Sequence, residues 1–374
     1  MTDTKPPVPL FDLTRQWHEV RDEVNAALGK VLATQQFILG PEVAALEQEC
    51  AAYLKVRRAV GVTSGTDALL AALMALNVGP GDEVITTPFT FFATAGVISR
   101  LGAKPVFVDI DARDFNLDPA RLKGAITART KAIIPVHLYG QAADMDAIKR
   151  AAGAIPLVED CCQAIGTEYN GVPVGGIGLM GCFSFFPTKN LGAFGDGGLI
   201  TTNDEALGER LVDMRLHGMR PKYVHNFVGG NFRLDAIQAA ILRVKLPRLP
   251  QWLAKRKAGA AHYRQLFATA DLGGVVGLPQ ELPGRGHTYH QFVVRVPERD
   301  RVREHLAKLG VGSEVYYPIP LHAQRCFADI GYKVGDFPES EEAAAEVLAL
   351  PIFPELRADE RERVVAGIAS YFKR

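Results

Sequence analysis

Lys189 is the side chain whose surroundings in this sequence point most directly to chemistry. It follows an apolar run at residues 181–186, which predicts a strand, and it comes just after Pro187, which ends the run. A glycine-rich stretch follows at residues 192–198. A lysine at such a break is held by the strand, yet its amine can point into a cleft, where desolvation lowers the pKa and favours the nucleophilic form.

A carboxylate follows a second predicted strand, upstream in the chain. The apolar run at residues 155–158 leads into Glu159 and Asp160, so a carboxylate stands at the carboxyl end of that strand. A lysine and an aspartate placed in this way suggest a pyridoxal phosphate site, in which the lysine forms a Schiff base and the aspartate binds the pyridinium nitrogen. Lys189 taken alone would be interpreted as a solvated surface charge, because most lysines are exposed.

A third candidate, the segment TSGTDAL at residues 63–69, lies between a predicted strand and a predicted helix. The backbone amides of Gly65 and Thr66, together with the Thr66 hydroxyl, would lie at the N-terminal end of the helix, where a phosphate is favoured. The competing interpretation is a capped helix start without a ligand, with Ser64 or Thr66 as the N-cap.

Three motifs, found together and in this order, resemble the sugar aminotransferases of the DegT/DnrJ/EryC1/StrS family. They are VEDCCQAIG at residues 158–166, SFFPTKNLG at residues 184–192 and NFRLDAIQAA at residues 231–240. The resemblance runs from about Pro9 to beyond Pro351. It implies the aspartate aminotransferase fold (fold type I), pyridoxal 5'-phosphate as cofactor, and a part in amino sugar biosynthesis for polysaccharides or antibiotics.

The resemblance also implies roles for the residues of these motifs. Lys189 would carry the cofactor, Asp160 would keep the pyridine nitrogen protonated, and Gln163 would contact the phenolic oxygen. Without the resemblance, Asp160 reads as an ordinary strand-end carboxylate and Gln163 as a solvated glutamine on a helix. The implied reaction is a ping-pong transamination in which glutamate is the usual amino donor of the family.

Further cofactor contacts are implied in the same way. Gly65, Thr66 and Ser184 match phosphate ligands, and Phe89 matches the aromatic residue that stacks on the cofactor ring. Aromatic side chains belong more often to the core than to a cofactor site. We therefore expect the two phenylalanines at residues 91–92 in the core.

Other residues would complete the site from a distance. Asn231 matches a residue that reaches across a dimer interface to the partner's cofactor phosphate, which implies a homodimer with shared active sites. Arg233 is expected to bind an anionic part of the substrate. Tyr316, Tyr317 and His322 lie in a segment that resembles the family's substrate loop, although a lone histidine or tyrosine is more often structural.

The implied substrate is a nucleotide-diphosphate ketosugar. Members with Arg-Leu-Asp after the interface asparagine look like those that act on 3-keto sugars, and this chain has that sequence at residues 233–235. Members that act at C4 tend to carry Arg-Met-Thr, and C4 amination stays the alternative. Many members associated with glucuronate-type substrates have histidine where this chain has Tyr316, which argues against a uronic acid. The sequence leaves open a UDP or a dTDP carrier.

Two other functions are compatible with the same fold. Sugar dehydratases of this type resemble the pattern with histidine in place of the lysine, and Lys189 argues against them. A non-catalytic regulatory protein would be expected to lose Asp160 or Lys189, and both residues are present.

Composition limits the class of protein independently. The 374 residues exceed the usual size of a single core, so we expect a large domain at residues 1–245 and a smaller α+β domain at residues 246–374. Lys+Arg and Asp+Glu number 42 each, which leaves no net charge to attract nucleic acid or a membrane surface. No apolar run approaches the length of a membrane span. The five cysteines lack metal-binding spacing, so we expect reduced thiols, no metal site and a cytoplasmic location.

Apolar runs and helical patterns alternate along most of the chain, which predicts an α/β fold with a mostly parallel sheet between helices. The expected strands are residues 59–63, 83–86, 104–108, 130–136, 155–158, 181–185, 198–202, 291–296 and 315–317. The expected helices are residues 14–31, 41–54, 67–76, 92–100, 119–126, 144–152, 301–309, 339–348 and 359–372. Residues 239–266 are expected to be helical with an interruption at Pro247 and Pro250. Residues 278–286 are expected to form a surface loop.

Overall fold

The computed structural model describes residues 6–373, and two adjoining sheets lie at its centre. Their strands are β1 (Arg58–Val62), β2 (Glu83–Thr86), β3 (Lys104–Phe107), β4 (Thr130–Ile133), β5 (Val158–Asp160), β8 (Met180–Ser184) and β9 (Gly198–Thr202). One sheet has the order β1-β9-β8-β5 and the other β3-β2-β4. Parallel bridges from Ile133 to Leu157 and from Val136 to Asp160 join them into one layer.

The strand directions confirm the expected mostly parallel sheet. Among the strands of this layer, β9 alone runs antiparallel, and it does so against both β1 and β8. The pairs β2–β3, β2–β4 and β5–β8 are parallel. The carboxyl ends of β5 and β8 therefore meet at the same edge of the sheet, and Asp160 and the segment that leads to Lys189 lie at that edge.

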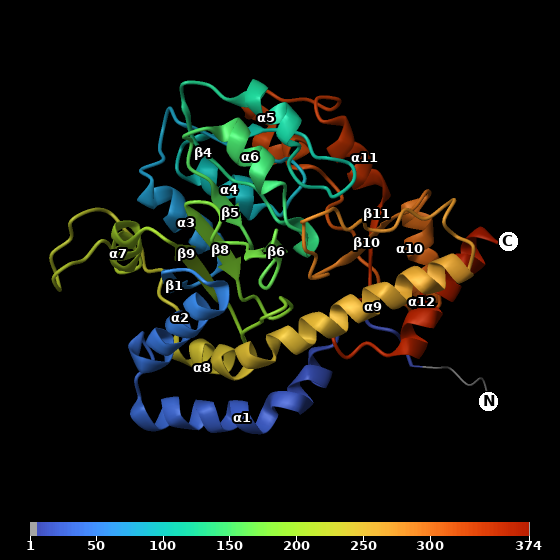
Figure 1. The fold of residues 1–374 in the computed structure, drawn as a ribbon, viewed down its shortest axis with the longest axis horizontal. Coiled ribbons are helices and arrows are strands. Elements are labelled where there is room, and N and C mark those ends of the chain that lie inside the picture. The colour runs from blue at the N-terminus through green and yellow to red at the C-terminus, as the bar shows by residue number, and fades with distance from the viewer. Residues whose placement is uncertain (1–5, 374) are drawn as a thin grey trace.

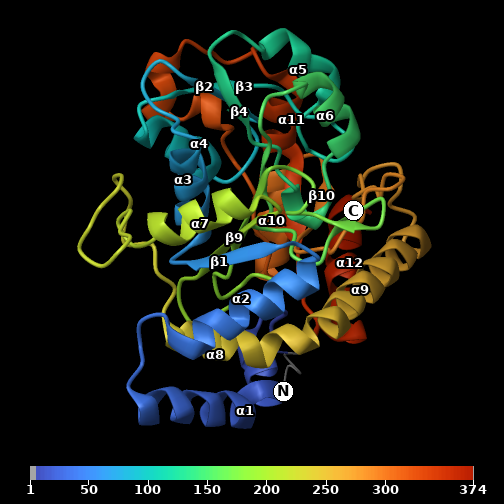
Figure 2. The ribbon, with the colours of Figure 1, turned by 60° about the vertical axis from the view of Figure 1, so that its left-hand side comes forward.

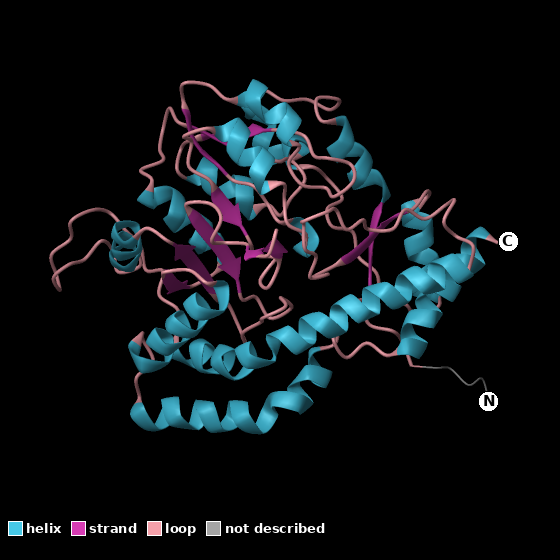
Figure 3. Ribbon diagram, in the orientation of Figure 1, coloured by secondary structure: helices cyan, strands magenta, loops and turns pink. Residues whose placement is uncertain are grey.

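Helices cover both faces of the sheet (Figures 1, 2 and 3). They are α1 (Leu13–Thr34), α2 (Gly40–Leu54), α3 (Gly65–Ala75), α4 (Ala93–Arg100), α5 (Pro119–Ala125), α6 (Met145–Ala152), α7 (Glu205–Met214) and α8 (Ala236–Lys245). Successive side chains of β8 point to opposite faces. Cys182 packs in the apolar cluster that contains α3, α4 and α7, whereas Phe183 packs with α2, α5, α6 and α8.

The C-terminal part forms a second apolar cluster around a two-stranded antiparallel sheet. Its elements are α9 (Leu249–Thr269), β10 (Phe292–Arg295), α10 (Arg299–Lys308), α11 (Pro338–Glu346), β11 (Val347–Leu350) and α12 (Ala358–Phe372). Figure 1 shows α8 and α9 following one another across the lower half of the molecule, with α1 below α8. A 3-10 turn at Leu246–Arg248 separates the two helices, which agrees with the interruption expected at Pro247 within the helical segment at residues 239–266.

Two expected elements differ from the structure, and one helix and one hairpin were not expected. Residues 315–317 form no strand, and the preceding Glu314 makes an isolated antiparallel bridge to Ala349. The helix expected at residues 339–348 ends at Glu346, because the apolar residues of β11 extend instead and pair with β10. Helix α7 was not expected, and neither was the short hairpin of β6 (Glu168–Tyr169) and β7 (Val172–Pro173).

We propose that the boundary between two domains lies at residues 245 and 246, where α8 ends. The beginning of the described chain nevertheless lies beside the C-terminal part, since Val8 N–H donates to Gly310 O at 2.8 Å. Phe89 and Tyr139 of the N-terminal part also belong to the C-terminal apolar cluster. Among residues 6–373, the structure contains no helix long and apolar enough to cross a membrane.

Candidate active site

Lys189 lies in a loop that closes directly after β8. Lys189 N–H donates to Phe186 O at 2.8 Å, and Ala193 N–H donates to Phe185 O at 2.7 Å. Strand β8 therefore carries the lysine to the edge of the sheet, and the loop fixes its backbone there. Strand β8 ends at Ser184, earlier than the break at Pro187 that the sequence predicts, and the loop after it bears the lysine.

A cavity of about 430 Å³ surrounds the Lys189 side chain. Burial lowers the pKa of the Lys189 amine, and the nearby Cys162 and Asp160 act in the opposite direction. The lowered pKa favours the uncharged amine, which is the nucleophilic form. The predicted site residues that line this cavity are Gly65, Thr66, Asp160, Gln163, Ser184, Lys189, Tyr316 and Tyr317.

Two hydrogen bonds orient the Asp160 carboxylate at the end of β5. Thr94 Oγ1 donates to Oδ2 at 2.8 Å, and Cys162 N–H donates to Oδ1 at 3.1 Å. Both Asp160 and Thr94 are buried. The carboxylate is thus held in one orientation at the cavity wall, where it can bind a positively charged group. Sequence reasoning missed Thr94, which comes from α4.

The first turn of α3 faces the same cavity. Ser64 is the N-cap, and its hydroxyl accepts a backbone N–H of the first turn at 3.0 Å. The N–H groups of Gly65 and Thr66 come next and have no helix carbonyl to bond, which leaves them available for an anion. A Cβ atom at Gly65 would lie 2.7 Å from both Cys162 Sγ and Ser184 Cβ, so this close approach of helix and strand requires glycine. The helix cap and an anion site are therefore compatible.

Gln163 is held between two tyrosines. Its Oε1 accepts the Tyr139 N–H at 2.6 Å, and its Nε2 donates to the Tyr317 hydroxyl at 3.0 Å. The Tyr139 hydroxyl donates in turn to the backbone carbonyl of Tyr316. Burial raises the pKa of the Tyr317 hydroxyl well above its ordinary value, so this group stays neutral and can act as a hydrogen-bond donor.

The aromatic residues before α4 are arranged differently from the prediction. Phe89 is fully buried and packs edge-on to Tyr317, with 6.3 Å between the ring centres, so it does not line the cavity. Phe91 does line the cavity and is 56% exposed, and Phe92 is 47% exposed. The prediction that Phe91 and Phe92 belong to the core is wrong. Residues 87–92 form an irregular turn, in which neither a helical nor a strand period decides which side chains face inward.

Three further predicted residues lie outside the cavity. His322 is buried, and its Nε2 lies 2.9 Å from Glu341 Oε1, within the C-terminal part. Asn231 is exposed and Arg233 is half-buried, and both lie on the segment that leads into α8. The structure therefore does not bring these side chains to Lys189 of the same chain.

The cavity also contains His290, which sequence reasoning missed. Burial, together with the neighbouring Lys189 charge, lowers the pKa of His290 well below its ordinary value, so the ring is neutral. His290 Nδ1 lies 3.4 Å from Asn190 Oδ1, in the loop that bears the lysine. His290 comes from the segment before β10, and nothing in the local sequence separates it from a core histidine.

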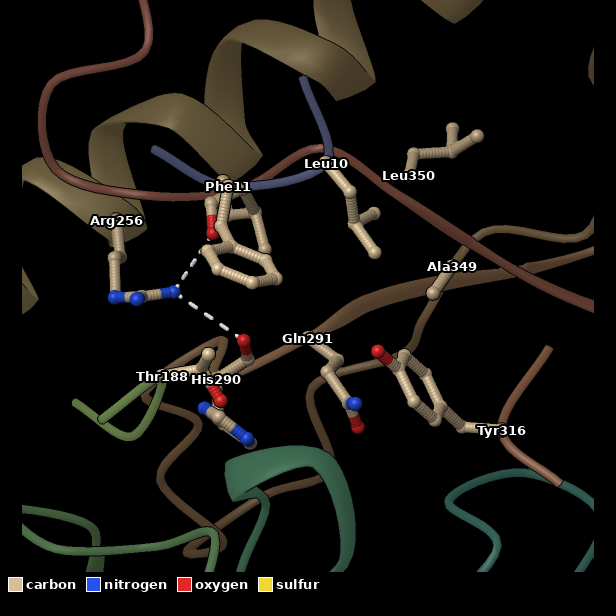
Figure 4. A pocket seen from close by; sticks show the side chains of 10 residues that line it. Leu10, Phe11, Thr188, Arg256, His290, Gln291, Tyr316, Ala349 and Leu350 are labelled. Carbon is tan, nitrogen blue, oxygen red and sulfur yellow. Dashed lines mark hydrogen bonds between the residues drawn. The ribbon is translucent and has the colours of Figure 1, made fainter. Parts of the chain in front are cut away.

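A second cavity of about 60 Å³ shares Thr188, His290, Gln291 and Tyr316 with the first. Figure 4 shows Arg256 at one side of it, with hydrogen bonds that hold neighbouring backbone carbonyls. Its Nη1 donates to the carbonyl groups of Tyr289, His290 and Ile352, at distances from 2.9 to 3.2 Å. Arg256 thus fixes the backbone that carries His290.

His137, Glu159 and Cys161 form a buried group whose atoms lie close enough together to surround a metal ion. His137 Nδ1 accepts the Ala143 N–H at 3.0 Å, so in the neutral ring Nε2 carries the proton and donates to Glu159 at 3.0 Å. Glu159 also accepts three backbone N–H groups of residues 175–178. These bonds already occupy the His137 and Glu159 atoms that could bind a metal ion. They account for the group as a buried hydrogen-bond network that holds β5 in place. The expectation of no metal site stays a prediction.

The chain matches the model of one protein family, described as the DegT/DnrJ/EryC1/StrS aminotransferase family, over residues 18–369. A "pleiotropic regulatory protein" of Geobacillus stearothermophilus is 50% identical over 98% of this chain and 99% of the relative. A UDP-N-acetyl-3-dehydro-alpha-D-glucosamine 3-aminotransferase of Acidithiobacillus ferrooxidans is 45% identical, over 96% of this chain and 97% of the relative. A dTDP-3-amino-3,4,6-trideoxy-alpha-D-glucose transaminase of Streptomyces venezuelae is 43% identical, over 99% and 97%.

Solved structures resemble the whole chain. DesV of S. venezuelae, in complex with a ketimine intermediate, superimposes with a TM-score of 0.95 at 42% identity and covers 99% of this chain and 100% of its own. NtdA of Bacillus subtilis, with bound cofactor PMP, gives a TM-score of 0.91 at 32% identity, over 100% of this chain and 87% of its own. These likenesses confirm the fold class expected from the sequence.

Proposed function

Because the chain belongs to the DegT/DnrJ/EryC1/StrS aminotransferase family, we propose that it transfers an amino group from glutamate to C3 of a nucleotide-linked 3-keto sugar. The observation that carries this proposal is the cavity in which Lys189 and Asp160 stand together. Relatives that are 45% and 43% identical are named for 3-amino sugar formation, which favours C3 over the alternative of C4. The Arg-Leu-Asp sequence at residues 233–235 agrees with C3.

The residues of the cavity fit pyridoxal phosphate. Its volume of about 430 Å³ lies within the range of roughly 300–1,000 Å³ that small-molecule sites occupy. The N–H groups of Gly65 and Thr66, with Ser184 beside them, would hold the phosphate. Asp160 would bind the ring nitrogen, and Gln163 would donate to the phenolic oxygen. Each of these residues lines the cavity and offers a hydrogen-bond donor or acceptor to the cofactor.

Phe91 is the better candidate for the aromatic side chain that stacks on the cofactor ring. It lines the cavity, whereas Phe89 is fully buried beneath Tyr317. We therefore assign ring stacking to Phe91 and support of Tyr317 to Phe89.

The chain's own residues supply the proton transfers. When bound, pyridoxal phosphate provides an electron sink for the charge that develops at the donor's Cα. Lys189 Nζ, whose pKa is lowered by burial, would move the proton that leaves this Cα to the cofactor carbon that takes up the amino group. In the second half of the reaction, the same amine would take a proton back from that carbon and deliver it to C3 of the sugar. Asp160, oriented by Thr94, stabilises the positive charge at the opposite end of the cofactor site.

The charge of the cavity supports a homodimer with shared sites. Among the residues of the described chain that line it, Lys189 is the lysine or arginine, whereas Asp160 and Asp196 are acidic. A nucleotide diphosphate adds further negative charge, so basic groups must come from elsewhere. The segment between α7 and α8 projects from the body of the molecule (Figures 1 and 2) and leads to Asn231 and Arg233. We assign these two residues to the active site of a second copy.

Spectroscopy and assays on defined sugars test this function. Protein loaded with pyridoxal phosphate should absorb visible light and lose that absorbance when glutamate is added. A panel of 3-keto and 4-keto nucleotide sugars, each on a UDP and a dTDP carrier, should give product only with the 3-keto sugars. Product from the 4-keto sugars alone would replace C3 by C4, and a Lys189→Ala protein that still transaminates would refute the role of Lys189.

A regulatory function is the second candidate, because the relative that is 50% identical carries the name of a regulatory protein. Such a role does not need Lys189 and Asp160 in one cavity, which favours catalysis here. Wild-type protein that binds pyridoxal phosphate but aminates no member of the sugar panel would favour regulation.

We also propose a cytoplasmic location. All five cysteines are free thiols, which suits a reducing compartment. Treatment of intact cells with a thiol reagent that does not cross membranes should leave the exposed Cys326 unmodified, whereas lysis should make it reactive.

A further inference from the structure

Lys245 is a buried lysine without an ion-pair partner in the described chain. It stands at the last position of α8 and is 1% exposed. Its ammonium group lies 5.5 Å from the ring centre of Phe194 and 6.0 Å from that of Trp252. Burial lowers the pKa of Lys245 to about 8. A buried charge costs free energy, so the contacts that Lys245 makes must offset that cost.

Lys245 contacts the loop that bears the catalytic lysine. Its Nζ donates to the carbonyl oxygen of Gly192, three residues after Lys189. Gly192 is the position where the loop closes, because a Cβ atom there would lie 2.2 Å from Pro187 O. Lys245 therefore bonds the backbone at the tightest point of the loop.

Gln238 holds the same loop from the same helix. Its Oε1 accepts the Phe194 N–H at 2.8 Å, and its Nε2 donates to Phe194 O at 3.4 Å. Gln238 and Lys245 are two helical turns apart on α8, so both side chains lie on one face of the helix. Together these two side chains form hydrogen bonds with the backbone of Gly192 and Phe194.

We propose that Gln238 and Lys245 form a clasp that positions the Lys189 loop for cofactor binding. The clasp is defined by the bonds from these two side chains to Gly192 and Phe194. Neither side chain lines the cavity, so both act through the loop backbone as positioning residues. The link to the cofactor rests on the proposed function, whereas the effect on the loop does not.

Hydrogen exchange of the cofactor-free protein tests the clasp directly. Lys245→Met and Gln238→Leu should speed the exchange of the amides of residues 188–194 by about threefold to tenfold, the factor for one ordinary hydrogen bond. Arg243→Met is the matched control, because Arg243 lies between them on α8 but pairs with Glu42 and Glu49. The control should leave the loop amides unchanged. Gln238 is only half-buried, so we expect Gln238→Leu to fold. If Lys245→Met does not fold, the Gln238→Leu variant alone still tests the clasp.

Cofactor spectroscopy provides the second readout. In both clasp variants, the pH midpoint of the visible absorbance of bound pyridoxal phosphate should shift relative to the wild type and the Arg243→Met control. The proposal would be overturned if the loop amides of both clasp variants exchanged at the rate seen in the Arg243→Met control. It would also be overturned if they exchanged faster only because every amide of the protein did so. Wild-type protein that binds no pyridoxal phosphate would refute the proposed function, while the exchange data would still decide on the clasp.

Discussion

Among single side chains, Thr94 and Asp160 show best how the site depends on distant parts of the sequence. Asp160 ends β5, and Thr94 lies in the first turn of α4, yet Thr94 Oγ1 is the side-chain donor that fixes one carboxylate oxygen. Without that bond the carboxylate can rotate away from the group that it binds. The hydroxyl is therefore expected to matter for rate more than for stability.

Thr94→Val should lower kcat by about tenfold, because it removes one hydrogen bond to a charged group, worth about 1.5 kcal/mol. The rate at which glutamate bleaches the bound cofactor measures this effect. Thr94→Ser keeps the hydroxyl and is expected to stay within about threefold of the wild type. Equal rates for the valine and serine variants would show that Thr94 does not orient Asp160.

The sequence predicts Lys189 and Asp160 because both follow apolar strand patterns, and the edge of a parallel sheet brings such residues together. The sequence does not predict Thr94 of α4 or His290, which precedes β10. Only tertiary packing brings these two segments to that edge of the sheet. Phe91 is missed for another reason. It stands in an irregular turn, where the choice between core and cavity depends on the path of the backbone.

His287 should make the folded state sensitive to acid. It is buried against Tyr289, and burial lowers its pKa to about 3. In the unfolded chain histidine titrates near 6.5, so between about pH 6.5 and about pH 3 the unfolded chain binds a proton that the folded chain does not. The free energy of unfolding is therefore unaffected by this histidine above about pH 6.5. Below that value it falls by about 1.4 kcal/mol for each pH unit.

Urea unfolding of the wild type and of His287→Asn at about pH 7 and about pH 5 measures this sensitivity. The free energy of unfolding of the wild type should fall by about 2 kcal/mol more than that of the variant between the two conditions. The comparison of the two changes cancels the cost of the substitution itself. An equal fall in both proteins would show that His287 is not the group that titrates.

Among the helices, α11 depends on a cap that comes from a distant part of the chain. Its own N-cap residue, Phe337, has no side-chain acceptor. Asp109, which follows β3, instead accepts the N–H groups of Glu339 and Ser340 at 3.0 Å each and the Ser340 hydroxyl at 2.6 Å. This cap joins the C-terminal part to the central sheet. A local search of the sequence for capping residues cannot find this cap.

Asp109→Ala should lower the free energy of unfolding by about 2 kcal/mol, since it leaves buried N–H groups of α11 without an acceptor. Asp118→Ala is the matched control, because Asp118 caps α5 from a half-buried position close by in the sequence, whereas Asp109 is buried. The control should cost only about 0.5–1 kcal/mol. Urea unfolding monitors both, and equal losses would contradict the special position of Asp109.

For the complete enzyme, the proposed sharing of active sites predicts complementation between two inactive chains. Lys189→Ala lacks the amine, and Asn231→Ala lacks the contact that we assign to the partner's site. Mixed and reassembled in equal amounts, half of the dimers should be hybrids with one intact site each. The mixture should regain about one quarter of the wild-type activity.

Aminotransferase assays on the mixture, with each variant alone as the baseline, measure this recovery. Both variants must be folded and dimeric by light scattering before they are mixed. No recovery under these conditions would mean that Asn231 serves no partner site.

The place of β9 has a consequence for biosynthesis of the chain. Val60 of β1 pairs with Ile200 of β9, and β9 is the strand that separates β1 from β8. During translation β1 leaves the ribosome long before β9, and parallel or long-range pairing forms slowly. The apolar strand β1, together with α2, therefore stays without its pairing strand until β9 has been synthesised. Nascent chains interrupted before β9 should be held by chaperones or aggregate, while those that extend past it can close the sheet.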